Sequence, residues 1–236
     1  MKLTWATGTD TGRVRSNNQD SVFPPQGSDT STNGLLIAVA DGMGGHVGGE
    51  IASSTALAAA LSADGTPRDR IAEANRAVLE AVRADHSLRG MGTTLTLASI
   101  ASDGSCVVGH VGDSRAYRAR GRDIVQLTAD HTVIAEYLAS GKITPAQAKR
   151  HPQRSVITRA VGIIDDLAVD QFEERFVPGD RLLICSDGLT AMVDDEQIRQ
   201  LIEAYAPDEA VRRLIEAANR AGGVDNITVA VVAFES

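Results

Sequence analysis

The 236-residue chain lacks the features that mark several large classes of protein. It has only two cysteines, Cys106 and Cys185, each inside an apolar run, so we expect reduced core thiols rather than a disulfide, and thiolate-bound zinc is excluded. No apolar stretch is long enough to span a bilayer, and residues 1–5 lack the apolar core of a signal peptide. We therefore expect a cytoplasmic protein with no membrane partner.

Basic residues are also scarce, with 23 Lys and Arg against 31 Asp and Glu and a formal net charge of -8. Nucleic acids and anionic lipids are bound by clustered Lys and Arg, so this balance disfavours both as partners. The glycine cluster after residue 41 contains no lysine, and Val47 stands where G-x-G-x-x-G spacing requires its last glycine. A nucleotide-binding loop is therefore disfavoured, and the acids are free to hold metal instead.

The sequence, which is 43% hydrophobic, can fill the core of one large domain. Apolar runs and period-two alternation predict strands, and amphipathic or alanine-rich stretches predict helices. We expect strands at 3–9, 35–40, 94–100, 106–111, 168–176, 181–185 and 227–234, and helices at 48–61, 68–84, 194–204 and 207–220, with a surface loop at 24–33. Strands with few intervening helices, followed by paired helices, indicate antiparallel sheets covered by helices. Residues 129–160 lose the strand pattern and are predicted to be an insertion over the sheet edge.

Five acids stand beside the predicted strands. Asp41, Asp113 and Asp187 each follow an apolar strand, whereas Asp20 and Asp225 lie in polar turns next to one. One strand-end Asp is ordinary turn chemistry, but five converging carboxylates would repel one another unless cations lay between them. Mg²⁺ and Mn²⁺ prefer such oxygen ligands and retain water that can act as a nucleophile.

A guanidinium beside these acids could bind a phosphate through paired hydrogen bonds. Arg15, in the polar segment before Asp20, is the first candidate, and Arg13 is its competitor.

Short motifs throughout the chain resemble, in their order, the metal-dependent serine/threonine protein phosphatases of the PPM (type 2C) family, most closely the compact bacterial members. They are Thr9-Asp10-Thr11-Gly12, Arg15 to Asp20, Asp41-Gly42-Met43-Gly44-Gly45, Gly92-Thr93-Thr94, Gly112-Asp113-Ser114-Arg115, Ser186-Asp187-Gly188-Leu189 and Val224-Asp225-Asn226-Ile227-Thr228. The resemblance implies an α+β fold, a four-layer αββα sandwich of two mainly antiparallel sheets flanked by helix pairs. It also implies a single catalytic domain over 1–236, with a flap at about 129–160.

The resemblance also implies a role for each site residue. Asp41 and the Gly42 carbonyl would bind two Mn²⁺ or Mg²⁺ ions, Asp41 bridging them. Asp187 and Asp225 would complete the first site, and Asp20 would support the second. Asp113 with Asp187 would hold a third, weaker metal, and Arg15 would bind the substrate phosphate.

The implied reaction is hydrolysis of phosphoserine and phosphothreonine monoesters by direct attack of dimetal-activated water. A phosphoaspartyl hydrolase would need a second Asp two residues after Asp41, where Met43 stands. Eukaryotic relatives place a histidine at the Met43 position, so the general acid is either His46 or metal-bound water. His131 and His151 are interpreted as structural or surface groups.

The implied partners are phosphorylated proteins, with a bacterial Ser/Thr kinase as the opposing enzyme, and we expect a monomer. Two alternatives stay open, a noncatalytic regulator with the same fold and a phosphatase of small molecules. The first would be expected to lose core ligands, yet all five acids and Arg15 are present.

Overall fold

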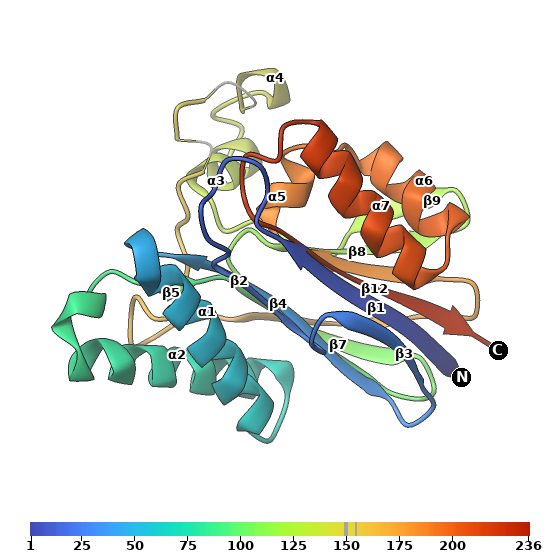
Figure 1. Cartoon of the computed structure of the whole chain (residues 1–236), viewed down its shortest axis with the longest axis horizontal. Helices are drawn as coiled ribbons and strands as arrows, with labels where there is room; N and C mark the ends of the chain where they lie inside the picture. Colours follow the sequence, from blue (N-terminus) through green and yellow to red (C-terminus); the bar gives the residue numbers. More distant parts are fainter. Residues whose placement is uncertain (149–150, 154) are drawn as a thin grey trace.

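The computed structural model describes residues 1–148, 151–153 and 155–236, apart from the side chain of His46. Two β-sheets face each other, with α1 and α2 covering one outer face and α6 and α7 the other (Figure 1). This arrangement confirms the predicted α+β sandwich of four layers.

The strands are β1 Lys2–Asp10, β2 Asp20–Phe23, β3 Gly27–Ser31, β4 Leu35–Met43, β5 Gly92–Thr93, β6 Leu95–Ile100, β7 Ser105–Val111, β8 Arg115–Arg120, β9 Asp123–Gln126, β10 Asp170–Arg175, β11 Arg181–Cys185 and β12 Ile227–Glu235. The helices are α1 Gly45–Ser62, α2 Pro67–Ala84, α3 Val133–Ala139, α4 Pro145–Ala148, α5 Asp187–Thr190, α6 Asp195–Ala204 and α7 Pro207–Arg220, with a 3₁₀ turn at His86–Leu88. No helix in this part of the chain is both long and apolar enough to cross a bilayer.

Strand order places β4 and β12 in the interior of their sheets and β2, which carries Asp20, at an edge. The first sheet runs β3-β1-β12-β11-β8-β9 and the second β10-β7-β6-β4-β2, with β5 paired to β4. All of the paired strands are antiparallel. Both edges of β4 and β12 are paired, and their faces are covered by the opposite sheet on one side and by helices on the other.

Burial on both faces explains why these two strands have continuous apolar sequences. In β4, Ile37 and Val39 pack between the sheets, while Ala38 and Ala40 pack beneath α1 and α2. In β12, Ala230 and Val232 lie between the sheets, while Val229 and Val231 lie under α6 and α7. The expected reduced thiols also agree with the structure, since Cys106 and Cys185 are buried and free.

The first edge strand was not predicted. Residues 24–33 are expected to be a loop, but Gly27–Ser31 forms β3, which pairs with β1 along one of its edges. Its side chains are mostly exposed and polar, so no hydrophobic alternation marks it. The assignment of Asp20 to a polar turn was also wrong, because Asp20 begins β2.

The insertion at 129–160 contains α3 and α4 in its described part. An isolated bridge joins Thr132 to Ile157 within the insertion, and another joins Val161, just after it, to Thr93 of β5. Lys149, Arg150 and Arg154 of the predicted flap lie outside the described residues.

Candidate metal centre

Six of the seven predicted site residues line one cavity of about 950 Å³, and they come from five separate segments of the chain. Asp41 and Gly42 lie near the end of β4, Asp187 begins α5, and the remaining residues lie in loops after β1, between β7 and β8, and before β12. The six are Arg15, Asp41, Gly42, Asp113, Asp187 and Asp225. The convergence expected of the acids is therefore present.

Asp20 lies beneath this cavity rather than in its lining. It is buried and stands directly opposite Asp41 in the β2–β4 pairing. Its Oδ2 accepts a 2.9 Å hydrogen bond from Ser186 Oγ, but its Oδ1 is buried without a partner. An unpaired buried carboxylate oxygen is costly, and a cation is one group that would satisfy it.

The main chain of Asp41 is held by two threonines. Asp41 N donates to Thr94 Oγ1 at 2.9 Å, and its carbonyl accepts from Thr94 N at 2.9 Å and from Thr93 Oγ1 at 2.8 Å. Thr94 Oγ1 also lies 2.7 Å from Ser114 Oγ, beside Asp113. Thr94 therefore positions two of the carboxylate-bearing segments. Both threonines belong to the Gly92-Thr93-Thr94 motif, but the sequence alone does not predict that they position Asp41.

Only glycine fits at position 42. A Cβ there would lie 2.1 Å from the carbonyl oxygen of Gly49 and 2.6 Å from that of Gln19, and both are main-chain atoms. This close approach packs the start of α1 against the end of β4, next to Asp41.

Arg15 and Asp225 form an ion pair, with 2.7 Å between Arg15 Nη2 and Asp225 Oδ2. The Asp225 carboxylate raises the pKa of the guanidinium, which stays charged and is about half exposed at 52%.

Asn226 sets the path of the loop that carries Arg15. Its Oδ1 accepts from Gln19 N at 2.8 Å, and its Nδ2 donates to the carbonyls of Thr11 and Asn17. Asn226 belongs to one of the motifs that carry the family resemblance, but the sequence alone does not predict this role.

The carboxylates share a strongly unfavourable electrostatic environment. Burial raises the pKa of Asp20 to about 7, and burial followed by the charge of Asp187 raises that of Asp113 to about 7. Burial, followed by the charges of Asp20 and Asp187, raises the pKa of Asp41 well above its ordinary value. The pKa of Asp187 is raised by burial and by Asp225. Such shifts indicate a site short of positive charge.

Within the described residues, no three His, Cys, Asp or Glu side chains already form a metal cage. Asp225 is held by Arg15 and Asp20 by Ser186. The donor set is nevertheless all oxygen, and Asp20 keeps one orphaned oxygen. These residues fit hard divalent cations such as Mg²⁺ and Mn²⁺, and they do not fit a soft metal.

None of the histidine side chains that the structure describes lines this cavity. His131 is buried, with Nδ1 accepting from Gly112 N at 3.1 Å and Nε2 3.1 Å from Asp170 Oδ2, which agrees with a structural role. Met43 lines the acidic cavity. The proposed acid His46 has its side chain outside the described residues.

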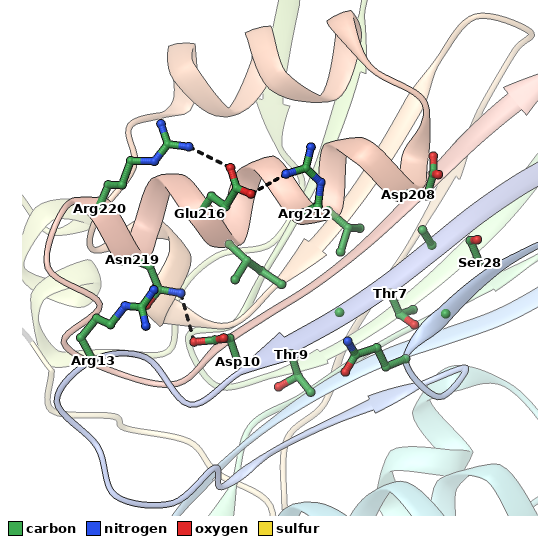
Figure 2. Close-up of a pocket in the computed structure, with 16 residues that line it drawn as sticks. Thr7, Thr9, Asp10, Arg13, Ser28, Asp208, Arg212, Glu216, Asn219 and Arg220 are labelled. Carbon is green, nitrogen blue, oxygen red and sulfur yellow. Dashed lines mark hydrogen bonds and ion pairs between the residues drawn. The ribbon is translucent and has the colours of Figure 1, made fainter.

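A second cavity, of about 790 Å³, lies between β1, β3 and α7 (Figure 2). Arg13 lines this cavity, so it is Arg15 and not Arg13 that lines the acidic one. Its polar groups largely satisfy one another: Glu216 pairs with Arg212 and Arg220, and Asn219 Nδ2 donates to Asp10 at 3.0 Å. It contains none of the predicted metal ligands.

Comparison with known proteins gives a consistent result. The profile of the family described as protein phosphatase 2C matches residues 7–222. The serine/threonine protein phosphatase PstP of Mycobacterium tuberculosis is 41% identical over 241 residues, which cover 98% of this chain and 45% of that protein. This chain therefore spans about half the length of that relative.

Two further similarities cover nearly the full length of both compared chains. The serine/threonine phosphatase stp of Listeria monocytogenes is 36% identical over 240 residues, covering 95% of this chain and 93% of that protein. A crystal structure of the catalytic domain of PstP in complex with two manganese ions has a TM-score of 0.87 and 34% identity, with complete coverage of both chains.

Proposed function

The chain belongs to the protein phosphatase 2C family, and on that premise we propose that it is a metal-dependent phosphatase of phosphoserine and phosphothreonine in proteins. The observation that carries the proposal is the gathering of four carboxylates and one guanidinium around a single cavity, with a fifth carboxylate directly beneath it. The relatives named as serine/threonine phosphatases support the same reaction class.

The residues that would hold two divalent cations are Asp41, the Gly42 carbonyl, Asp187 and Asp225, with Asp20 in support. The relative crystallised with two manganese ions supports two cations. The lack of positive charge beside the buried carboxylates supports Mn²⁺ or Mg²⁺. Asp113 with Asp187 would hold a third, weaker ion. When bound, the two cations would lower the pKa of their water and so supply a nucleophile at neutral pH.

Arg15 would bind the phosphate of the substrate. A guanidinium carries five N–H donors, and Asp225 accepts from Nη2, which leaves others for the phosphate oxygens. Because Arg15 lines the same cavity as the four carboxylates, it would orient the phosphorus toward them. Water adds to phosphorus and the P–O bond to the serine or threonine oxygen breaks, giving inorganic phosphate and the free hydroxyl. This oxygen takes up a proton as it leaves.

We further propose that residues 1–236 act as one catalytic domain whose flap, at about 129–160, lies beside the cavity. The proposed partners are phosphorylated proteins and a bacterial Ser/Thr kinase that this phosphatase opposes, and the proposed state is a monomer.

The test is release of inorganic phosphate from a phosphothreonine peptide with and without Mn²⁺. We expect metal-dependent turnover that falls at least about 1,000-fold in Asp41→Asn and in Asp187→Asn, since each removes a shared ligand. Asp64→Asn, at an exposed position, is the matched control and should retain wild-type turnover. No hydrolysis by the wild type in excess Mn²⁺ would support the noncatalytic regulator instead. Faster turnover of sugar phosphates than of peptides would support the small-molecule phosphatase.

A further inference from the structure

Besides Met43, three apolar side chains line the acidic cavity, and two of them are exposed to solvent. Val14 directly precedes Arg15 and is 68% exposed, and Val224 directly precedes Asp225 and is 45% exposed. Ile157, from the predicted flap, lines the same cavity. Single exposed valines are common on protein surfaces, but here the residues share one cavity with the phosphate-binding arginine. We call these three residues the apolar rim.

The two valines stand on loops that are hydrogen-bonded to each other. Arg13 N donates to Gly223 O at 2.7 Å, and Asn226 Nδ2 donates to Thr11 O and Asn17 O at 3.0 and 2.9 Å. Gly12 packs so closely that a Cβ there would lie 2.3 Å from Asp225 O. Because the loops are fixed before any ligand arrives, contact with the valines costs little conformational entropy.

Ile157 is fixed on the other wall of the cavity. It bridges to Thr132, and the flanking main chain is bound through Val133 N to Val156 O at 3.0 Å and through Thr158 N to His131 O at 2.8 Å. Figure 1 shows the loop after β1 and the chain around α3 at the same end of the molecule. The rim therefore has members on three segments that are far apart in sequence.

The charges in the cavity are already assigned to the metals and the phosphate. Among its described lining residues, the charged ones are Arg15 and the four carboxylates. The remaining lining residues are apolar or uncharged: Val14, Ser16, Asn17, Gln19, Gly42, Met43, Gly44, Gly45, Ser155, Ile157 and Val224. Apart from Arg15 and the carboxylates, the part of this lining that the structure describes therefore offers methyl groups and neutral polar groups to the residues next to a bound phosphoserine or phosphothreonine.

We propose that the apolar rim binds apolar side chains on either side of the phosphorylated residue, so that the preferred substrates are phosphopeptides with apolar flanking residues. This inference rests on the proposed phosphatase function and names its substrate class. Full burial of a valine contributes about 1.5–3 kcal/mol, and a surface contact buries only part of it. Two such partial contacts would lower KM about three- to tenfold for a peptide with apolar flanking residues, relative to a peptide without them.

The first experiment measures kcat/KM of the wild type, with Mn²⁺, on three phosphothreonine peptides whose flanking residues are valine, serine or lysine. p-Nitrophenyl phosphate, which has no flanking residues, serves as the reference substrate. We expect the valine-flanked peptide to be preferred over the other two by about three- to tenfold, through KM. Equal values, or preference for lysine, would overturn the inference.

The second experiment compares Val14→Thr and Val224→Thr, alone and combined, with the control Val125→Thr. Val125 is 42% exposed on β9, at the edge of the first sheet farthest from β3. The readout is the ratio of kcat/KM for the valine-flanked peptide to that for p-nitrophenyl phosphate. We expect a three- to tenfold fall in this ratio in the double variant and no fall in the control.

The two proposals fail in different ways. If the wild type hydrolyses neither the phosphothreonine peptides nor p-nitrophenyl phosphate in Mn²⁺, the proposed function itself is wrong. If it does hydrolyse this reference but the ratio is the same in wild type and double variant, only the role of the rim is wrong.

Discussion

Replacement of Asp20 by Asn removes one negative charge from beneath the acidic cavity and leaves an amide oxygen that can still accept from Ser186. In the metal-free protein, burial raises the pKa of Asp20 from 3.8 to about 7. The folded state therefore holds this proton more tightly than the unfolded state does. The resulting stability is fully present below pH 3.8 and is lost as the pH rises through about 7.

The magnitude follows from the size of the shift. One pKa unit corresponds to about 1.4 kcal/mol, so the loss amounts to roughly 2 kcal/mol at pH 5 and roughly 4 kcal/mol at pH 8. Asn does not titrate and escapes this loss. The stability of Asp20→Asn relative to wild type should therefore increase by about 2–3 kcal/mol between pH 5 and pH 8. For a domain of this size that corresponds to about 4–12 °C in Tm.

The assay is thermal unfolding in EDTA at pH 5 and pH 8, read as the difference in Tm between variant and wild type. Only the change of this difference with pH is diagnostic, because an Asn amide beside the unpaired Oδ1 position adds a cost that does not vary with pH. The buried histidines, such as His110 with its pKa lowered to about 4, titrate in both proteins and cancel. Asp64→Asn is the exposed control. A difference that stays constant between the two pH values would refute the reasoning.

Three further substitutions test individual contacts. Arg15→Ala should raise KM for a phosphopeptide about 10- to 100-fold, because charge-assisted hydrogen bonds to the phosphate are lost; steady-state kinetics with KM unchanged would contradict this. Gly42→Ala should lower the free energy of unfolding by about 3 kcal/mol or more, because its Cβ would meet main-chain oxygens at 2.1 and 2.6 Å; urea unfolding with an unchanged midpoint would exclude that clash. Thr94→Val should weaken Mn²⁺ binding about 10- to 100-fold, although Thr94 is not a proposed ligand, because it removes the hydrogen bond that Asp41 N donates to Thr94 Oγ1; equal affinity in a calorimetric titration would show that this side chain does not position the site.

The elements most readily predicted from the sequence are those whose own pattern determines their burial. β4 and β12 are continuous apolar runs because both faces are covered, and α2 is an amphipathic helix with a Thr66 capping box. The acids could be proposed as a group because Asp41, Asp113 and Asp187 each follow such a strand.

The unpredicted features depend on partners that are distant in the sequence. β3 is a strand only because β1 lies beside it, and its exposed polar residues give no periodic signal. Asn226 and Gln19 are 207 residues apart, yet their hydrogen bond sets the loop that carries Arg15. The burial of Asp20 and its contact with Ser186, 166 residues later, likewise arise only when the two sheets pack together.

The central claim is that these carboxylates, drawn from separate segments, bind divalent cations together. Calorimetric titration of Mn²⁺ into the metal-free protein tests it directly. We expect at least two ions per chain, and loss of the tightest binding in both Asp41→Asn and Asp187→Asn while Asp64→Asn binds like wild type. Absence of Mn²⁺ binding, or binding that is the same in all four proteins, would contradict the claim.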